Sequence, residues 1–316
     1  MAAVVSAGSV NVDRIYRTSR ADLDRLADRY GWFPDRGETV VRSALPDGFA
    51  GDPDLVRHGG KGANQGVAAA AAGADTAFLG AVGRDASEFG VLEALTAAGV
   101  GVEDVMSVEG ATGTAFVFVD PDGEDRIVVR PGANGHVDEA YVMGHYGVVA
   151  AADCLLLQNE IPIEPVRILL DRLAQEPAPP AVLLDPAPAA GVDPLLESEA
   201  VTYLTPNEVE YTALDGALGT FGGTVIRKRG PAPVLVEDDT SFAVTPPTVD
   251  VVDTTGSGDV FNGYLAARLS AGDPLRAAVE TATVAGALSV RAEGARGGVP
   301  SLEAVRAFQR RERSGA

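Results

Sequence analysis

Short apolar segments that end in polar residues alternate along the chain with longer segments of helical pattern, and this alternation constrains the fold most. Buried strands are predicted over residues 76–82, 151–158, 181–185 and 203–205. Helices are predicted over residues 88–98, 275–291 and 302–311. Buried strands that alternate with helices form parallel sheets covered on both faces. The sequence therefore predicts an α/β fold with a doubly wound, mostly parallel sheet and helices on both faces.

A glycine-rich turn follows an apolar stretch late in the chain. We expect a strand over residues 249–252, then the turn Gly256-Ser257-Gly258, then a helix that begins near Asp259. Backbone N–H groups of such a turn converge at the positive end of the helix dipole, which favours an anion. Asp259 beside this hole is suited to take a proton from an alcohol while the hole holds a phosphoryl group. The alternative is an ordinary turn in which Asp259 only caps the helix.

A second glycine-rich loop, at residues 58–62, precedes an alanine-rich run that is predicted to be helical. Gly60 permits close approach of the backbone to a ligand, and Lys61 and Asn64 offer donors suited to hydroxyl groups. The chain has only two lysines, Lys61 and Lys228. A chain that relies on arginine yet keeps a lysine between glycines is expected to need a compact ammonium there. The alternative is a surface lysine in a flexible loop.

The N-terminal segment 4–13 begins as a buried strand and ends with two polar residues, Asn11 and Asp13. The period of two in a strand places both side chains on one face. An amide and a carboxylate side by side can grip vicinal hydroxyls. In an open α/β sheet the ligand lies beyond the carboxyl ends of the strands, where this pair falls.

These motifs occur with four others in one order, and the set resembles that of the PfkB/ribokinase family of carbohydrate kinases. The matching stretches are residues 8–13, 59–64, 80–85, 158–160, 185–189, 205–210 and 253–259. They span nearly the whole chain, and together they are specific although each alone is weak. The resemblance implies a ribokinase-like fold with a small β-sheet lid. It implies ATP-dependent phosphorylation of a sugar hydroxyl, with D-ribose favoured and D-ribose 5-phosphate as product.

The resemblance also implies a role for each matching residue. Asp259 would be the catalytic base, and the backbone of Gly256, Ser257 and Gly258 would form the anion hole. The sugar would be bound by Asn11, Asp13, Gly60, Lys61, Asn64 and Glu160. ATP and the Mg²⁺ shell would be held by Asn207 and Glu210, with Lys228 and Gly230 in the nucleotide loop. A K⁺ ion would be coordinated by Asp253, Thr255 and the loop 291–299, which includes Gly294.

The chain departs from the family pattern in three regions, one of which is the Pro-rich segment 176–180, predicted to connect a helix to a strand. The nucleotide loop 225–231 carries Arg227, Lys228 and Arg229 where small residues are usual. Lys228 and Arg229 either contact phosphates or are solvated, and the choice of nucleotide rests on this loop. The chain is also longer than expected between Asp13 and Gly59. It holds a charged helix predicted over residues 19–32 and a polar stretch, 45–56, which we expect to decorate the lid.

The lid is predicted to consist of segments 14–58 and 112–130 of a single domain, residues 1–316. Strands are expected around residues 38–44 and over 114–119 and 126–129, the last two joined by a turn. A small sheet of this kind has an exposed edge and an apolar face that need cover. We expect a homodimer through the lid. The alternative is that the added segment 19–35 covers the lid within one chain and leaves a monomer.

The amino-acid composition indicates which binding partners and which cellular compartment to expect. The net charge of −20 makes a nucleic-acid partner unexpected. The acid excess and the scarcity of lysine are typical of a halophilic cytoplasm, with an acidic mesophile as the alternative. The single cysteine, Cys154, cannot form an internal disulfide. No apolar run is long enough to cross a membrane, so we expect a cytoplasmic location and no membrane partner.

Two functional alternatives remain open at this point. One is a kinase of the same family that acts on another sugar, a sugar acid or a nucleoside. The other is a catalytically silent sugar-binding or regulatory protein on the same fold. The retention of Asp259 beside its glycine-rich turn argues against the silent protein, which would be free to lose them.

Overall fold

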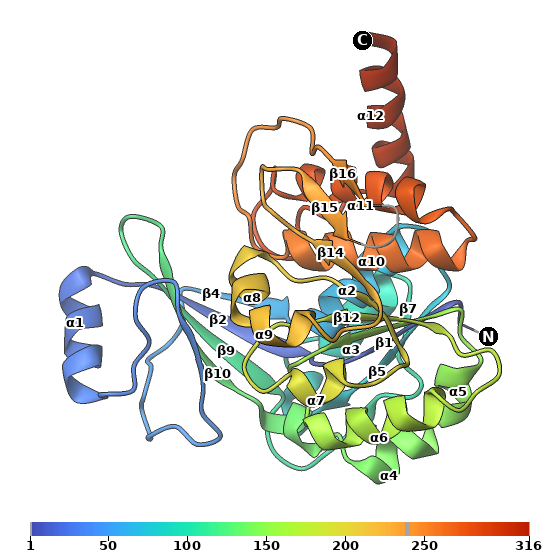
Figure 1. The fold of residues 1–316 in the computed structure, drawn as a ribbon. Coiled ribbons are helices and arrows are strands. Elements are labelled where there is room, and N and C mark those ends of the chain that lie inside the picture. Colours follow the sequence, from blue (N-terminus) through green and yellow to red (C-terminus); the bar gives the residue numbers. More distant parts are fainter. Residues whose placement is uncertain (1, 238–240, 316) are drawn as a thin grey trace.

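The computed structural model describes residues 2–237 and 241–315, and its centre is a nine-stranded sheet (Figure 1). The strand order is β16-β15-β14-β13-β12-β11-β1-β5-β7. All pairs are parallel except those that add β15 and β16 at one edge. In chain order the strands are β1 (Val4–Ala7), β5 (Thr76–Leu79), β7 (Val100–Gly101), β11 (Cys154–Gln158), β12 (Ala181–Asp185), β13 (Val201–Leu204), β14 (Thr224–Arg227), β15 (Val234–Glu237) and β16 (Phe242–Val244).

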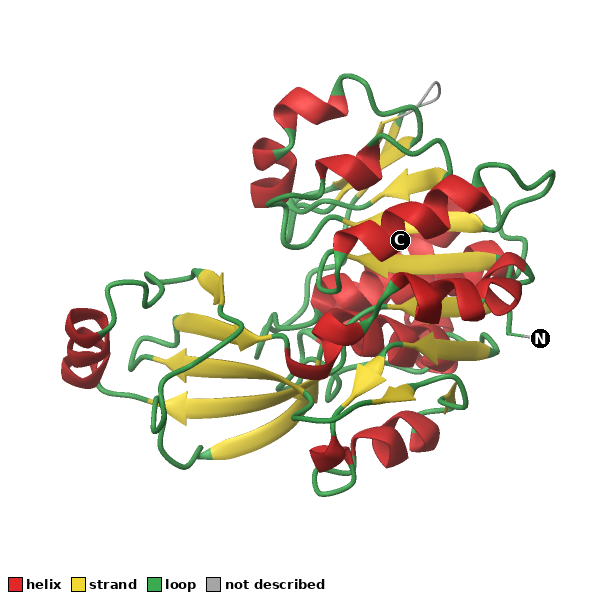
Figure 2. Cartoon of the chain, turned by 90° about the horizontal axis from the view of Figure 1, so that it is seen from below, coloured by secondary structure: helices red, strands yellow, loops and turns green. Residues whose placement is uncertain are grey.

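Helices cover both faces of this sheet (Figure 2). Its central strands, such as β11, are therefore buried on both sides. Side chains of α4 (Glu139–Gly144) and α6 (Ile163–Leu173) lie in the core on one face. Those of α2 (Lys61–Ala71), α10 (Ser257–Ser270) and α11 (Leu275–Ser289) lie in the core on the other. The predicted doubly wound, mostly parallel α/β fold is confirmed.

Shorter elements complete this body. The remaining helices are η1 (Arg84–Ala86), α3 (Val91–Ala97), η2 (Gly132–His136), α5 (Tyr146–Ala150), α7 (Asp193–Leu196), α8 (Glu208–Ala213), α9 (Asp215–Leu218) and α12 (Leu302–Gly315). Strands β6 (Ala81–Val82) and β8 (Met106–Ser107) form a separate parallel pair. Helix α12 projects away from the main body (Figure 1). No helix in the described part of the chain combines the length and the apolar character needed to span a bilayer.

The strand predicted over residues 249–252 does not form. Val251 and Val252 are 63% and 60% exposed, so no sheet face buries them. The N–H groups of Val252 and Asp253 instead donate to the carbonyl of Val290, at the end of α11. The apolar pattern was misleading here because the segment runs beside a helix terminus rather than beside a strand.

A second, five-stranded sheet stands off the main body (Figures 1 and 2). Its order is β3-β10-β9-β2-β4, and this sheet is called the lid below. Its strands are β2 (Asn11–Arg17), β3 (Thr39–Val41), β4 (Leu55–Gly59), β9 (Gly113–Val119) and β10 (Asp125–Arg130). The lid strand β2 begins four residues after β1 ends. Asn11 and Asp13 therefore belong to the lid itself, and they lie just beyond the carboxyl end of β1.

The added segment between β2 and β4 packs on one face of the lid. It contains α1 (Arg20–Arg29), whose N-cap is Ser19, so the charged helix predicted over residues 19–32 is confirmed in a shorter form. An aromatic cluster joins this segment to the lid strands. Its buried rings are Tyr16, Tyr30, Phe33, Phe49, Phe116 and Phe118. The chain thus covers this apolar face of its own lid.

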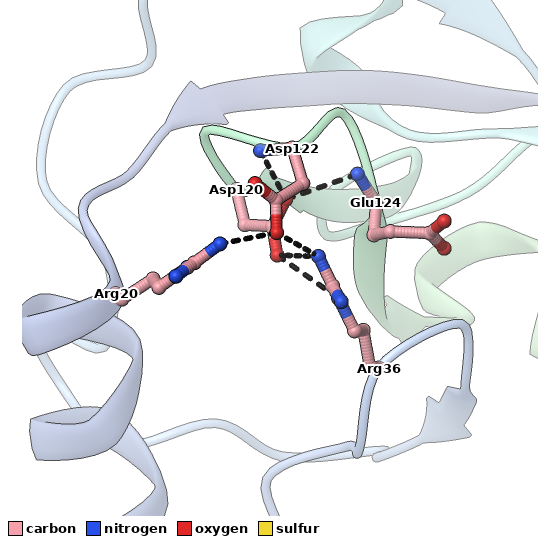
Figure 3. A network of polar contacts seen from close by, with 5 residues as sticks. All are labelled: Arg20, Arg36, Asp120, Asp122 and Glu124. Carbon is pink, nitrogen blue, oxygen red and sulfur yellow. Dashed lines mark hydrogen bonds and ion pairs between the residues drawn. The ribbon is translucent and has the colours of Figure 1, made fainter.

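Ion pairs fasten the same segment to the turn between β9 and β10 (Figure 3). The guanidinium of Arg36 lies 2.7 Å from Asp120 and 2.6 Å from Asp122. Arg20, at the start of α1, pairs with Asp122. Asp120 also accepts hydrogen bonds from the N–H groups of Asp122 and Glu124, which closes the turn. The turn and the added segment therefore share one polar network.

Candidate active site

The glycine turn before α10 is built as its sequence predicts. Gly256 is the N-cap of α10 with φ of 75°, a conformation that glycine adopts without strain. A Cβ atom at Gly256 would lie 2.6 Å from the Cα atom of Ala295, so a side chain is excluded by space as well. Ser257 and Gly258 form the first turn of α10, which leaves their N–H groups at the positive end of the helix.

Asp259 lies in the first turn of α10 and is 6% exposed. Two amide side chains from α2 hold its carboxylate. Asn64 donates to one oxygen and Gln65 to the other, each at 3.1 Å. Burial raises the pKa of Asp259 to about 6, although the nearby Lys61 charge opposes the shift. The result is an oriented carboxylate that is a stronger base than an ordinary aspartate.

The second glycine motif brings the backbone against the lid strand β2. Gly60 has φ of 87°, and a Cβ atom there would lie 2.6 Å from the Cα atom of Val10. A Cβ atom at Gly59 would collide with the carboxylate of Asp13. Burial raises the pKa of Asp13 to about 7, against the opposing charge of Arg296. Asp13 and this loop, which were both predicted to bind the sugar, are therefore in direct contact.

Lys61 and Glu160 meet at the N-terminus of α2. The N–H of Lys61 donates to Glu160 at 3.1 Å, and the hydroxyl of Ser9 donates to the same carboxylate oxygen. Burial by itself would lower the pKa of Lys61, but the charges of Asp259 and Glu160 outweigh it and raise that pKa. Lys61 is thus a stably charged ammonium among carboxylates, and the surface-lysine alternative does not describe it.

Asn11 faces an amide that the motifs did not indicate. Its side-chain oxygen accepts a hydrogen bond of 2.8 Å from Asn134 in η2. Asn134 also donates to the carbonyl of Val10 and accepts from its N–H. Asn134 therefore fixes the start of β2 and the rotamer of Asn11.

A buried polar chain runs from Asp259 toward the nucleotide loop. Gln65 donates to Asp185 at 2.8 Å as well as to Asp259, and its own oxygen accepts from Gln158 at 2.7 Å. Asp185 pairs with the ammonium of Lys228 at 3.1 Å. A Cβ atom at Gly258 would lie 3.4 Å from that ammonium. Lys228 is therefore placed beside the glycine turn and is not a solvated surface group.

Asn207 and Glu210 hold each other at the start of α8. The side chain of Asn207 accepts from the N–H of Glu210, and Glu210 accepts from the N–H of Asn207, both at 2.8 Å. Burial and the charge of Asp185 raise the pKa of Glu210. Gly230 lies exposed with φ of 57° in the loop that follows β14.

The two arginines of the nucleotide loop, unlike Lys228, contact Glu208. Its carboxylate pairs with Arg227 at 2.5 Å and with Arg229 at 2.8 Å. The guanidinium of Arg227 also lies over the ring of Tyr211, 3.9 Å from its centroid. Arg229 is therefore engaged in an ion pair on α8 rather than free in solvent.

Asp253 joins two loops beside the glycine turn. One of its oxygens accepts from the N–H of Thr255 at 2.9 Å and the other from the N–H of Gly294 at 2.7 Å. Burial alone would raise the pKa of Asp253, but these hydrogen bonds outweigh it and lower that pKa. Within residues 2–237 and 241–315, no group of three or more His, Cys, Asp or Glu side chains is placed to hold a metal ion.

Several site residues were not predicted from the sequence. Gln65 directly follows the stretch 59–64 and Asp185 begins the stretch 185–189, but neither was given a role from the sequence. Arg296 lies in the loop 291–299 and reaches the other side of the site. It donates to the side-chain oxygen of Asn64 at 2.8 Å and to the carbonyl of Gly59 at 3.0 Å. No sequence pattern distinguished the side chains of Asn134 and Ser9 from those of neighbouring residues as functional.

The structure therefore brings both glycine motifs together around the buried carboxylate of Asp259, where the N-termini of α2 and α10 meet. Comparison with known proteins places this site in a family. The model of the pfkB family carbohydrate kinases matches residues 55–302. The chain belongs to this family.

Individual relatives agree with that assignment. A ribokinase of Lactococcus lactis is 34% identical, with 95% of this chain and 94% of that protein covered. An ATP-dependent ribose-1-phosphate kinase of Halopiger xanaduensis is 32% identical, with 98% of both chains covered. The structure of an Arabidopsis thaliana ribokinase complexed with ribose and ATP is similar with a TM-score of 0.78 and 28% identity. The match covers 97% of this chain and 98% of that one.

Proposed function

We propose that this protein transfers the γ-phosphoryl group of ATP to a hydroxyl group of a sugar, with D-ribose as substrate and D-ribose 5-phosphate as product. The observation that carries the proposal is Asp259, buried and held by Asn64 and Gln65 beside the Gly256 turn. The relatives named ribokinase and the neighbour complexed with ribose and ATP support the choice of sugar and donor.

Asp259 acts as the general base. Its raised pKa and its two amide contacts leave an oriented carboxylate that can accept the proton of the sugar hydroxyl. The hydroxyl oxygen then attacks the γ-phosphorus, and the bond to the ADP oxygen breaks. The N–H groups of Gly256, Ser257 and Gly258 stabilise the charge on the transferred group.

The sugar is held between α2 and the lid strand β2. Asp13 and Asn11 accept and donate hydrogen bonds to its ring hydroxyls, while the backbone at Gly60 allows the ring to approach. Lys61, Asn64 and Glu160 complete the pocket. Three hydrogen bonds support the assignment, because they fix the side chains of Glu160, Asn64 and Asn11.

The nucleotide lies on the other side of the glycine turn. Lys228 binds the phosphates, Gly230 allows close approach of the loop, and Asn207 and Glu210 orient the Mg²⁺ shell. Mg²⁺, when bound there, would supply positive charge that neutralises the phosphates. A K⁺ ion would be held by Asp253, Thr255 and backbone of the loop at Gly294. The hydrogen bonds from the N–H groups of Thr255 and Gly294 to the two oxygens of Asp253, which bring these three residues together, support this site.

A second candidate substrate is a sugar that already carries a phosphate group. The relative from Halopiger xanaduensis is named as an ATP-dependent ribose-1-phosphate kinase. The observation that favours this candidate is Arg296, a cation directed into the sugar side of the site.

We further propose that the chain is one domain, residues 1–316, with lid segments 14–58 and 112–130, and that it forms a homodimer through the lid. The net charge of −20 supports a cytoplasm of high salt, where acidic surfaces stay hydrated. No nucleic-acid or membrane partner is proposed, because the chain has no excess of basic residues.

The proposal is tested by incubating the purified protein with ATP, Mg²⁺ and a panel of sugars, sugar acids and nucleosides in concentrated potassium chloride. ADP formation is expected with ribose or its phosphate, and the product is identified by mass. If no member of the panel yields ADP above the ATPase background, the proposed function is wrong.

A further inference from the structure

A loop of the main body, between α11 and α12, contacts the lid directly. Its Glu293 accepts a hydrogen bond of 2.8 Å from the guanidinium of Arg57. Arg57 belongs to the lid strand β4, where it lies opposite Asp13 of β2. A Cβ atom at Gly294 would collide with the same guanidinium, so Arg57 also packs against the backbone of the loop. The lid and this loop therefore share a contact that combines a charge pair with close packing.

The same loop contacts the glycine turn before α10 with its next two residues. The N–H of Gly294 donates to Asp253 at 2.7 Å, and Asp253 accepts a second hydrogen bond from the N–H of Thr255. Ala295 lies against Gly256, since a Cβ atom at Gly256 would be 2.6 Å from the Cα atom of Ala295. The position of the loop therefore affects the position of the N–H groups at the start of α10.

Arg296 connects this loop to the sugar-binding motif. Its guanidinium donates to the side-chain oxygen of Asn64 and to the carbonyl of Gly59, the last residue of β4. The loop thus contacts β4 at two points, Arg57 and Gly59. The two contacts differ in kind, because Arg296 touches a residue that is assigned to the sugar, whereas Arg57 acts on the site through the loop.

The ion pair of Arg57 with Glu293 adds little to stability by itself. The two side chains are 29% and 64% exposed, and water weakens a charge pair that is so accessible. The guanidinium nevertheless occupies the space that a side chain at Gly294 would need. Arg57 is therefore suited to hold the loop in one position rather than to stabilise the fold.

We propose that Arg57 is a positioning residue, which couples the position of the lid to the geometry of the glycine turn before α10. A sugar bound against the lid would thereby favour phosphoryl transfer at that turn. This catalytic consequence rests on the proposed kinase activity, whereas the structural link between lid, loop and turn does not.

The direction of the coupling follows from the contacts. A sugar that binds Asp13 holds β2, and β4 is paired with β2 over residues 55–59. Arg57 then holds the loop at Gly294, and the turn at Gly256 keeps its N–H groups directed at the transferred phosphoryl group. An arrangement of this kind stabilises the transition state more than the bound sugar. Its loss is therefore expected to lower kcat and to leave KM unchanged.

The test compares the full-length wild type with Arg57→Gln, Arg57→Lys and Glu293→Gln. The matched control is Arg167→Gln, which removes an arginine paired with Glu164 on α6. Kinetics with ATP, Mg²⁺ and ribose give kcat and KM separately, and ribose 1-phosphate replaces ribose if it yields more ADP. Calorimetry gives the affinity for the same sugar without ATP, and thermal midpoints check that each variant is folded.

Hydrogen exchange of two segments, 252–260 and 291–299, is followed by mass spectrometry with and without the sugar. Without sugar, Arg57→Gln should exchange faster than the wild type in segment 291–299. Addition of sugar should slow the exchange of segment 252–260 in the wild type and in the control, but not in Arg57→Gln. These measurements need no turnover, so they report the structural link separately from the catalysis.

Arg57→Gln is expected to lower kcat by about 2- to 30-fold, with KM and calorimetric affinity for the sugar unchanged. Glu293→Gln should have a smaller effect in the same direction, because Arg57 still packs against Gly294. Arg57→Lys should recover part of kcat, since it keeps the charge but not the planar group. If Arg57→Gln does not fold, Glu293→Gln, at an exposed position, decides the question.

Two results overturn the inference. A higher KM with unchanged kcat in Arg57→Gln would make this residue a support of the sugar pocket alone. Wild-type kinetics and wild-type exchange in the same variant would leave the contact without a role. Absence of ADP with every sugar refutes the proposed function and the catalytic consequence, and the exchange of segment 291–299 then still decides whether Arg57 holds the loop.

Discussion

Two opposing demands meet at Asp259. Burial makes its carboxylate a better base, but a buried charge is unfavourable unless it is compensated. The amides of Asn64 and Gln65 and the charge of Lys61 provide that compensation, and each of these groups comes from the first turns of α2. The packing of α2 against α10 is therefore what would allow Asp259 to act as the proposed base.

Replacement of Asp259 by Asn is expected to lower kcat by about 10²- to 10⁴-fold, because the shape is kept and the proton acceptor is removed. Sugar binding measured by calorimetry should change little. Asp24→Asn, an exposed position on α1, serves as the control and should match the wild type. Turnover of Asp259→Asn near the wild-type value would exclude Asp259 as the base.

The activity is expected to rise with pH through about 6. Asp259 must be deprotonated to act, and its pKa is raised to about 6, so protonation inactivates the enzyme below that pH. Burial raises the pKa of Asp13 to about 7, and the charge of Asp259 adds to that shift. A profile of kcat/KM from pH 5 to 8 should show this ascending limb. A flat profile over that range would contradict the assigned base.

The sequence predicts the role of a residue best when that role depends on its immediate neighbours in the chain. The glycines at 60 and 256 could be predicted to be required, because their turns need a backbone free of Cβ. Gln65, Asp185 and Arg296 could not, because their importance depends on which partners the fold brings near. Arg296 is separated from Asn64 by more than two hundred residues, and no local pattern encodes that contact.

Among the elements, the loops that flank α10 and α11 act together. Asp253 accepts hydrogen bonds from Thr255 in one loop and from Gly294 in the other. A cation that binds beside this carboxylate would hold both loops, and with them the N–H groups of the glycine turn. The proposed K⁺ ion would therefore act by ordering the anion hole rather than by contacting substrate.

Activity is expected to be higher in potassium chloride than in sodium or caesium chloride at one fixed high concentration. The fixed concentration equalises general screening, so the difference reports the size selectivity of a site. Asp253→Asn should reduce the difference among the three salts, since it weakens the anionic ligand. The same rate in all three salts with the wild type would count against a specific cation site.

Whether a segment forms a helix or a strand was easier to predict from the sequence than which other segment it packs or pairs with. The helices after the two glycine turns and the strand over residues 181–185 form where the pattern predicts them. The strand predicted over residues 249–252 fails, because strand pairing depends on an available sheet edge and this segment meets α11 instead. Periodicity indicates what a segment can form, whereas the fold decides what it pairs with.

At the scale of the whole molecule, the lid has one face covered by its own chain. The aromatic cluster around Phe49 and the ion pairs of Arg36 hold the added segment there. A second copy cannot use the same face. The outer sides of β3 and β4 end the sheet order, and Val41, Leu55 and Val56 on them are 51%, 38% and 40% exposed. The predicted homodimer would therefore form through these edges.

Light scattering in concentrated potassium chloride is expected to give a mass near twice 32.4 kDa. Val41→Lys or Val56→Lys should shift the mass toward the monomer, because a charged residue on an edge strand opposes pairing with another strand. Val209→Lys changes an exposed valine of α8 outside the lid and should leave the mass unchanged. A wild-type mass near 32.4 kDa over a wide range of protein concentrations would refute the dimer. In that case the added segment between β2 and β4 would bury the apolar face of the lid within one chain, and no second copy would be needed.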